Sequence, residues 1–496
     1  MPIPEIRRRL VNDEAVRDER AFVLYWMIAQ RRVRWNFALD HAADEARRLG
    51  KPLVVLEALR CGYRWASDRL HRFVLEGMAS NARRMADSPV RYLAYVESEA
   101  GEGRDLLGDV AAEACLVVTD DYPAFFLPRM VAAAGRKLDV RLEAVDSNGL
   151  LPLRAADKAY ARAVDMRRFL QKTLPSHLGE FPRADPLEEA SGAPLPEAPL
   201  PKAFAEGRRY RDSAPALGRG QLPDLGALPI DHGVAPVTEE GGGEAADRRL
   251  DAFLESRLRR YQDGRLDLGD RSTSGLSFHL HFGHISTHQI FAELVRRESW
   301  QPDSLGSTTR GQREGWWNMS ANAESFLDEF VTWRELGYNN CAHLEEFDTY
   351  ESLPQWARTS LELHLGDERP HLYELDDFER ARTHDELWNA AQRELLRTGR
   401  IHNYLRMLWG KKIFEWSPTP QAALEVMIEL NNKYAVDGRD PNSYSGIFWV
   451  LGRHDRAWGP ERPIYGKIRY MTSDSARRKL ALGDYLDRFG AAGGGR

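Results

Sequence analysis

Short apolar runs alternate with longer amphipathic stretches along the first 146 residues. The intervening stretches, such as NFALDHAADEARRLG, place their apolar residues at helical spacing. The apolar runs are predicted strands: FVLYWM (22–27), PLVVLEAL (52–59), VRYLAYVE (90–97), ACLVVTDD (114–121) and LDVRLEAV (138–145). This β-α-β rhythm predicts a doubly wound, Rossmann-like parallel sheet, which we assign to residues 1–150.

A doubly wound sheet usually binds its ligands beyond the carboxyl ends of the strands. The sequence contains neither G-x-G-x-x-G nor G-x-x-x-x-G-K-[ST], and the glycines of GEGRDLLG have a different spacing. A standard dinucleotide site or P-loop is therefore not predicted.

The composition changes after this first region. Residues 151–245 are rich in Pro, Gly, Ala and Glu in part, as in PRADPLEEASGAPLPEAPLPKAF, and are predicted to form an interdomain linker. From residue 246 to residue 496, helical periodicity dominates, as in THDELWNAAQRELLRTG. We therefore expect an α/β domain followed by an all-α domain.

The stretch TGRIHNYLRMLWGKKIFEW, residues 398–416, predicts one helix with two kinds of position. Its apolar residues recur at helical spacing and are expected to be core: Leu405, Leu408, Trp409, Ile413 and Trp416. Its first turns are interrupted by His402, Asn403, Arg406 and Met407, where a purely structural helix would carry Ala, Glu or Leu. The helix is therefore predicted to be a wall of a site.

Composition narrows the class of protein. The 496 residues contain no uncharged apolar run near the ~20 residues of a membrane span, and the N-terminus lacks the apolar core of a secretory signal. We expect a cytoplasmic protein without a membrane segment. The three cysteines, Cys61, Cys115 and Cys341, lie too far apart to indicate a disulfide framework and are expected to be buried. A net charge of −6 restricts any nucleic-acid surface to a local basic patch.

Residues 272–289, STSGLSFHLHFGHISTHQ, place hydroxyl groups and a glycine before a predicted helix. Such a stretch offers backbone N–H groups and hydroxyl donors to a phosphate at the positive end of the helix dipole. Two of its histidines, His284 and His288, are four residues apart. No carboxylate or thiolate nearby completes a zinc set, so no metal is predicted.

The sequence AESFLDEFVTWREL places Glu329 and Trp333 one helical turn apart on the same face. Taken alone, this spacing is more typical of a half-buried Trp beside a solvated Glu than of a site. In the loop that follows residue 431, Asp437 would form an ion pair with Arg406 if the loop folds back on the helix before it.

Residues 453–480 contain eight basic and three acidic residues, with Trp458, Tyr465 and Tyr470 interleaved. Basic residues mixed with aromatic ones are typical of nucleic-acid contact. A solvated face has the same composition, so both interpretations stay open at this point.

Six segments, taken in order, resemble the photolyase and cryptochrome family, most closely the class II cyclobutane pyrimidine dimer photolyases. They cover nearly the whole chain: FVLYWMIAQRRVRWNFAL, SGLSFHLHFGHIS, ESFLDEFVTWREL, THDELWNAAQRELLRTGRIHNYLRMLWGKKIFEW, LNNKYAVDGRDPN and ERPIYGKIRYM. The resemblance implies an N-terminal antenna-type domain and a helical domain that binds folded FAD. It also implies light-driven splitting of pyrimidine dimers in UV-damaged DNA. The chain departs from the family at Phe278-His279, where Pro-Tyr is common.

The resemblance also implies roles for individual residues. Glu329 would hydrogen-bond the carbonyl edge of the dimer, and Asn431 would face N5 of the flavin. The other substrate-binding positions are Trp333, Met407, Trp449 and Arg469. The tryptophan chain that reduces the flavin would be Trp388, Trp409 and Trp416. The flavin-binding positions are Tyr261, Thr273, Ser274, Gly275, Leu276, Ser277, Asn389, Gln392, Asn403, Arg406, Asn431 and Asp437.

Two other functions stay open at this stage. A cryptochrome-like light sensor would bind FAD without repair, although such a sensor needs no dimer pocket. A non-photochemical protein could bind single strands through its basic, aromatic C-terminal segment. The resemblance implies a monomer and leaves open an antenna chromophore, a deazaflavin or a folate.

Overall fold

The structure is a computed structural model that describes residues 3–188, 193–205, 209–268 and 272–491. The chain divides into two compact units, each assembled from three stretches. Unit 1 comprises residues 1–156, 173–251 and 275–302; unit 2 comprises residues 157–172, 252–274 and 303–496.

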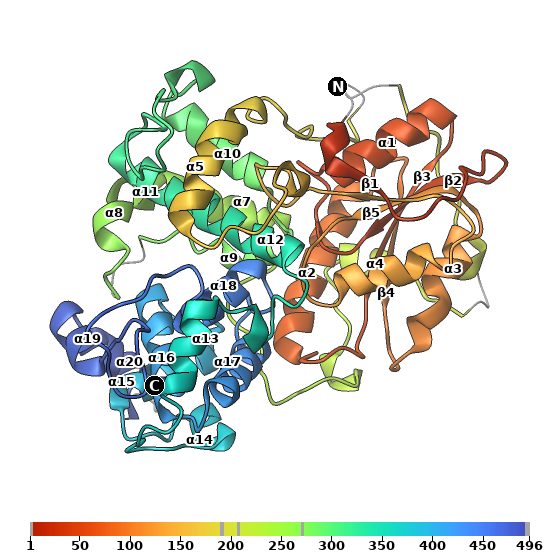
Figure 1. The fold of residues 1–496 in the computed structure, drawn as a ribbon. Coiled ribbons are helices and arrows are strands. Elements are labelled where there is room, and N and C mark those ends of the chain that lie inside the picture. Colours follow the sequence, from red (N-terminus) through yellow and green to blue (C-terminus); the bar gives the residue numbers. More distant parts are fainter. Residues whose placement is uncertain (1–2, 189–192, 206–208, 269–271, 492–496) are drawn as a thin grey trace. The chain divides into compact units, whose positions relative to one another are not determined.

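Unit 1 is built on a six-stranded sheet with the order β1-β6-β5-β2-β3-β4 (Figure 1). The strands are β1 (Arg8–Leu10), β2 (Phe22–Met27), β3 (Leu53–Leu59), β4 (Arg91–Val96), β5 (Ala114–Asp120) and β6 (Leu142–Val145). Strands β2 to β6 are parallel and confirm the five predicted strands and the predicted fold class. The antiparallel edge strand β1 was not predicted, because Arg-Arg-Leu is exposed and has no apolar run.

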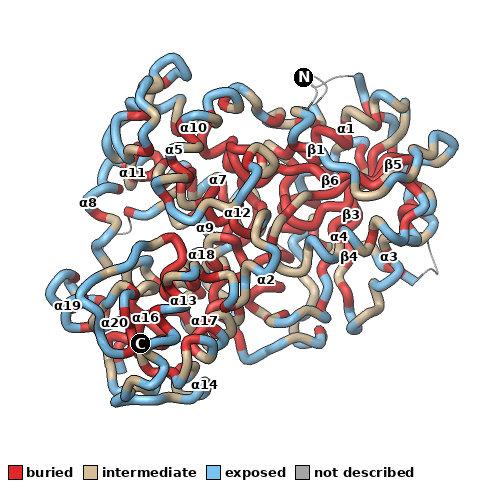
Figure 2. Tube along the Cα trace, in the orientation of Figure 1, coloured by how far each residue is buried: buried red, intermediate tan, exposed pale blue. Residues whose placement is uncertain are grey.

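The central strands β2 and β5 are buried at every residue, which explains why they read as continuous apolar runs (Figure 2). The helices of this unit are α1 (Phe37–Leu49), α2 (Asp68–Met85), α3 (Leu106–Ala111), α4 (Leu127–Gly135), α6 (Ala214–Gly218), α9 (Ser277–His281) and α10 (Thr287–Arg297). Asn36 caps α1 by accepting hydrogen bonds from the N–H groups of Ala38 and Leu39. All three cysteines of the chain are free and buried, as predicted.

The expected linker at 151–245 includes ordered, packed segments. Leu195, Ala214 and Leu217 belong to the same apolar cluster as the sheet. The N–H of Ala198 donates to the carbonyl of Pro89, so this proline-rich stretch packs without regular secondary structure. Residues 189–192 and 206–208 of the expected linker lie outside the described residues.

Unit 2 is built from helices. They are α8 (Tyr261–Gly264), α11 (Ala321–Leu327), α12 (Arg334–His343), α13 (Gln355–Leu363), α14 (Leu375–Glu379), α15 (Glu386–Thr398), α16 (Asn403–Trp416), α17 (Pro420–Tyr434), α18 (Pro441–Val450), α19 (Ser473–Lys479) and α20 (Gly483–Phe489). Two further helices, α5 (Ala163–Thr173) and α7 (Gly243–Ala252), contain two of the five points where the chain passes between the units.

The prediction of one helix over residues 398–416 is wrong at its start. Helix α15 continues to Thr398, and α16 begins only at Asn403. Gly399 between them has φ 70°, a left-handed conformation that ends a helix and that glycine adopts without a steric penalty. The predicted core positions from Leu405 to Trp416 are buried, as expected.

Candidate active site

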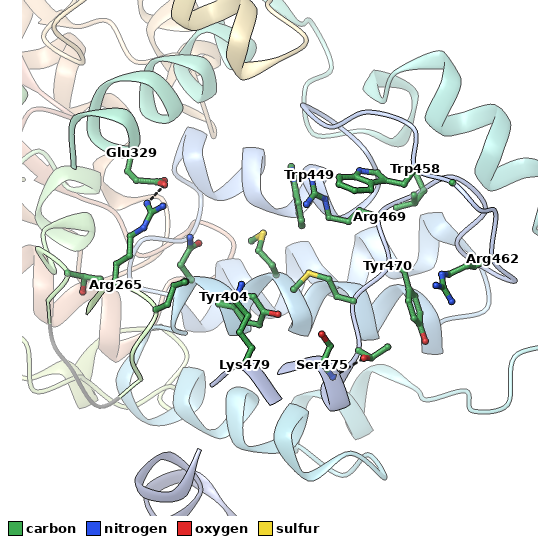
Figure 3. Close-up of a pocket in the computed structure, with 18 of the residues that line it drawn as sticks. Arg265, Glu329, Tyr404, Trp449, Trp458, Arg462, Arg469, Tyr470, Ser475 and Lys479 are labelled. Carbon is green, nitrogen blue, oxygen red and sulfur yellow. Dashed lines mark hydrogen bonds and ion pairs between the residues drawn. The ribbon is translucent and has the colours of Figure 1, made fainter. Parts of the chain in front are cut away.

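Unit 2 contains a cavity of about 800 Å³, a size typical of cofactor and ligand sites (Figure 3). Side chains from α8, α16, α18 and α19 line it, together with the loop at 458–472. Glu329 and Arg265 lie together on another part of the wall. The predicted site residues that line the cavity are Tyr261, Thr273, Glu329, Asn403, Met407, Trp449 and Arg469.

The first turns of α16 form one wall, as the sequence predicts. Asn403, Tyr404 and Met407 line the cavity, whereas Leu405 and Leu408 are buried in the protein. Of the four residues predicted to interrupt the apolar stripe, Asn403 and Met407 face the cavity, whereas His402 and Arg406 are not among its lining residues.

Glu329 lies on a π-helical turn, Asp328–Trp333, between α11 and α12. Such turns are rare and frequently occur at functional sites. The prediction of a regular α-helical turn is wrong here. A π-helical turn contains more residues than an α-helical turn, so Glu329 and Trp333, four positions apart, do not lie directly above one another on one face. Glu329 lines the cavity, and Trp333 is half-buried and not among the lining residues.

The carboxylate of Glu329 is held by Arg265, whose Nη1 lies 2.7 Å from Oε1 (Figure 3). The preceding residue is anchored as well, because Arg167 donates two hydrogen bonds to Asp328, at 2.8 and 3.1 Å. Burial raises the pKa of Glu329 above its usual range, and the positive charge of Arg265 opposes that rise.

Arg406 and Asp437 form the predicted ion pair, with Nη2 2.8 Å from Oδ1. The same nitrogen donates to the amide oxygen of Asn431 at 3.2 Å. The Asn431 amide nitrogen donates in turn to Ser443 at 2.7 Å. The loop after α17 therefore does fold back on α16. The Nε of Arg406 is buried and has no hydrogen-bond partner among the described residues, and Arg406, Asn431 and Asp437 are not among the residues that line the cavity.

The side-chain amides of two predicted flavin-binding residues, Asn389 and Gln392, form hydrogen bonds with other residues of the protein. Asn389 exchanges hydrogen bonds with Thr383, at 2.8 Å to its carbonyl and 2.9 Å from its hydroxyl. Gln392 accepts from the indole N–H of Trp409 at 2.8 Å. Neither residue lines the cavity.

The predicted phosphate-binding stretch is only partly brought to the cavity. Thr273 lines it, and the hydroxyl of Ser272 is buried without a hydrogen-bond partner in the described residues. Ser274 belongs to unit 2, whereas Gly275, Leu276 and Ser277 belong to unit 1. Gly275 has φ 68°, consistent with a sharp turn before α9.

The two histidines four residues apart, His284 and His288, have different neighbours. His284 accepts a hydrogen bond from the backbone N–H of Gly242 at 2.9 Å, and His288 packs edge-on against Phe37 and Phe181. Within the described ranges, no group of three or more His, Cys, Asp or Glu side chains could hold a metal ion.

The three predicted chain tryptophans lie on the packed pair α15 and α16. The rings of Trp388 and Trp416 are 6.0 Å apart, centroid to centroid. The indole N–H of Trp388 donates to the backbone carbonyl of Trp409 at 3.0 Å. Tyr373 and His384 lie beyond Trp416, at 5.7 and 4.9 Å from its ring. The structure thus buries all three indoles and brings the rings of Trp388 and Trp416 into contact.

A stack of alternating cations and indoles flanks the cavity, and the sequence did not reveal it. The amine of Lys411 lies 4.8 Å from the Trp449 ring, and the Arg469 guanidinium lies 5.4 Å from that ring and 4.1 Å from Trp458. Arg456 lies 4.3 Å from Trp458. Trp449, Arg469 and Trp458 appear side by side in Figure 3.

Asp455 holds this stack in place. It accepts two hydrogen bonds from Arg469, at 2.8 and 3.1 Å, and one from the indole N–H of Trp458 at 3.1 Å. Arg469 is therefore paired within the protein.

Several lining residues escaped the sequence analysis. Arg265 gave no local signal, since only the fold brings it to Glu329. The basic and aromatic composition of residues 453–480 did contain Trp458, Arg462, Tyr470 and Lys479, but nothing in the sequence separated them from their neighbours.

The fold is that of the photolyases. A bacterial class III photolyase from Agrobacterium tumefaciens superposes with a TM-score of 0.64 over 95% of this chain and 86% of that chain, at 17% sequence identity. No model of a protein family matches the chain.

Two relatives match over almost the full length. The deoxyribodipyrimidine photo-lyase of Methanothermobacter thermautotrophicus is 31% identical over 484 residues, 97% of either chain. That of Arabidopsis thaliana is 30% identical over 471 residues, 94% of this chain and 88% of the relative. The chain therefore belongs to the photolyase and cryptochrome family, which confirms the resemblance seen in the sequence. Among the described helices, none is long and apolar enough to cross a membrane.

Proposed function

We propose that this protein is a light-dependent DNA repair enzyme of the class II type, which uses FAD to split cyclobutane pyrimidine dimers. The observation that carries the proposal is the cavity of unit 2, where a carboxyl group, a thioether and an indole meet: Glu329, Met407 and Trp449. The names of the full-length relatives support the reaction class.

The residues fit a flavin dinucleotide. The unused Nε donor of Arg406 and the adjacent carboxylate of Asp437 suit the polar edge of a flavin ring, and Asn431 lies within the same network. Tyr261 and Asn403 add polar groups to the cavity wall. When bound and fully reduced, FAD supplies an electron donor that is activated by light.

The chain's own residues would prepare the dimer for that electron. Trp449 offers an indole face to the bases, and Met407 fills space beside them. Burial raises the pKa of Glu329, which makes its carboxyl group easier to protonate, and the protonated form can donate a hydrogen bond. Such a donor stabilises the negative charge that develops on a carbonyl oxygen of the dimer. Extruding a dimer costs less than flipping intact bases, because the dimer is already poorly stacked.

The proposal includes two further parts that need their own tests, the electron route to the flavin and the antenna chromophore. Trp388, Trp409 and Trp416 would carry electrons from the surface to oxidised flavin before repair begins. An antenna chromophore, a deazaflavin or a folate, would bind in unit 1. The carboxyl ends of the parallel strands are where such a sheet usually binds a ligand. At the end of β5, Asp120 fixes the loop after β2 by accepting hydrogen bonds from the N–H groups of Ile28, Ala29 and Gln30. We further propose that the protein acts as a monomer in the cytoplasm.

The experiment that tests the function begins with the absorption spectrum and the released chromophores of protein purified in dim light. FAD should be released on denaturation, and any deazaflavin or folate should appear with it. Reduced protein under blue light should then restore thymines in an oligonucleotide that carries one thymine dimer. FMN, or no flavin after reconstitution, would contradict the proposal. Bound FAD without repair would favour the cryptochrome-like sensor.

A further inference from the structure

Lys411 is fully buried, which is unusual for a lysine. It lies on α16 beside Gly410, where α16 and α18 approach closely: a Cβ at Gly410 would come within 2.5 Å of a Val450 methyl carbon. This close approach lets the Lys411 amine reach the carbonyl of Val450 at 2.6 Å.

Val450 is the last residue of α18, so its carbonyl belongs to the unpaired set at a helix C-terminus. An ammonium group there satisfies the carbonyl and complements the negative end of the helix dipole. The same amine lies 4.8 Å from the centre of the Trp449 ring. Lys411 therefore contacts both the end of α18 and the indole that lines the cavity.

We propose that Lys411 is a positioning residue for the substrate pocket, which fixes the Trp449 indole by a cation–π contact and by the hydrogen bond to Val450. The inference rests on the proposed function, since it assumes that Trp449 packs against the dimer. Lys411 itself does not line the cavity, so it acts through Trp449.

The charge on Lys411 changes near neutral pH. Burial lowers its pKa to about 7; the negative charge of Asp455 opposes this shift, and the positive charge of Arg469 adds to it. The hydroxyl of Tyr465 also meets this residue and donates to the Lys411 backbone carbonyl at 2.9 Å. The ammonium form predominates below pH 7, and only that form makes a cation–π contact. Trp449 should therefore be held most firmly in mildly acidic solution.

The first test follows Trp449 directly by ¹⁹F NMR of holoprotein labelled with 5-fluorotryptophan, in the dark and without DNA. The Trp449→Phe variant assigns its resonance. In the unsubstituted protein, the resonance should shift with a midpoint near pH 7, and in Lys411→Met that titration should vanish. The matched control is Lys412→Met, because Lys412 pairs with Glu415 and lies over Trp416, not Trp449. It should leave the Trp449 titration unchanged.

The second test measures binding of an oligonucleotide with one thymine dimer at pH 6. Lys411→Met should weaken binding about three- to tenfold, the usual range for loss of one cation–π contact. The control Lys412→Met should bind as before. A Trp449 resonance that does not titrate in the unsubstituted protein overturns the inference, and so does equal titration in Lys411→Met.

The result of the Lys411 tests can be distinguished from a failure of the proposed function. A protein that holds FAD but splits no dimer still reports the Trp449 titration, because the NMR measurement needs neither light nor DNA. If Lys411→Met fails to fold, the titration of the unsubstituted protein decides alone.

Discussion

Glu329 shows how one side chain can be set for its role by two opposing effects. Burial raises its pKa, while the contact with Arg265 favours the charged form. The balance decides whether the carboxyl group donates a hydrogen bond to a dimer or only accepts one. This is a property of the fold, because Arg265 and Glu329 are 64 residues apart in the sequence.

We expect Glu329→Ala to retain flavin and to repair thymine dimers about ten- to hundredfold more slowly per photon absorbed. The loss corresponds to one hydrogen bond to a developing charge, about 1.5 to 3 kcal/mol. Glu329→Gln should recover part of the rate, since its amide can donate. An unchanged yield in Glu329→Ala would remove Glu329 from the mechanism.

The pH dependence of repair gives a second measure of the same group. Because the pKa of Glu329 is raised, the donating, protonated form is present at low pH and is lost as pH rises through that pKa. The yield per photon of the unsubstituted protein should fall over that interval, and Glu329→Gln should lack this fall. A pH profile shared by both proteins would assign the dependence to another group.

Lys411 should make the free energy of unfolding depend on pH, whereas a surface lysine whose pKa is unchanged by folding adds no such dependence. Its pKa is about 7 in the folded protein and about 10.4 in an unfolded chain. Between these values the unfolded chain binds more protons, so the free energy of unfolding rises with pH. Below pH 7 the folded state carries the full cost of the buried charge. Lys411→Met should therefore stabilise the protein more at pH 6 than at pH 9, by about 2.7 kcal/mol, measured by guanidinium unfolding of both proteins.

At the scale of single elements, hydrophobic pattern predicted most strands and helices but not their irregularities. The apolar runs predicted the parallel strands because each is buried on both faces, whereas β1 carries two arginines and has no such run. The helical spacing of apolar residues predicted one helix that continues through Gly399, but the left-handed backbone conformation of Gly399 ends α15 there. The π turn at Glu329 likewise follows from packing that no local spacing reveals.

The pair α15 and α16 gives a physical reason for three tryptophans in the proposed electron chain. Trp409 and Trp416 are seven residues apart on one helix, about 10 Å along its axis. Trp388 on the neighbouring helix links the two residues: its ring lies 6.0 Å from the Trp416 ring, and its indole N–H donates to the backbone carbonyl of Trp409. Without Trp388, an electron would have to pass directly between Trp409 and Trp416 over this longer distance.

Replacing Trp388, Trp409 or Trp416 by Phe keeps most of the buried area, so FAD content should survive. Light-driven reduction of oxidised FAD should fail in each variant. Dimer splitting by protein that was reduced chemically should persist, because repair needs only transfer to the dimer. The control Trp300→Phe, which changes a buried indole in unit 1, should behave like the unsubstituted protein. Normal photoreduction in all three variants would remove these indoles from the route.

At the scale of the whole molecule, sequence composition separated an α/β region from a helical one but described each as a single range. The compact units are instead assembled from three stretches each, and the proline-rich segment supplies core residues to unit 1. Composition reports how ordered a segment tends to be, and it does not report which core the segment joins. Composition fails to predict the site for the same reason, because Arg265 and Lys411 acquire their roles through contacts with residues far away in the sequence.

An acidic protein that binds DNA must concentrate its positive charge. The net charge is −6, yet three basic residues, Arg462, Arg469 and Lys479, line the cavity of unit 2 at separate places on its wall (Figure 3). Asp455 neutralises Arg469, whereas Arg462 and Lys479 lie over the rings of Tyr470 and Tyr404. Arg462 and Lys479 are therefore the better candidates for phosphate contacts.

Binding to dimer-containing duplex should weaken as salt rises, because each neutralised phosphate releases counterions. A plot of log affinity against log salt should lose about 0.9 from its slope for each phosphate contact removed, in Arg462→Ala and again in Lys479→Ala. The control Arg380→Ala removes an exposed arginine that pairs with Asp376 and does not line the cavity, so its slope should be unchanged. Arg469→Ala should weaken binding with a smaller change of slope, because its charge is already paired and its loss mainly disturbs the Trp449–Trp458 stack. Equal slopes in all four variants would place the DNA surface elsewhere on the protein.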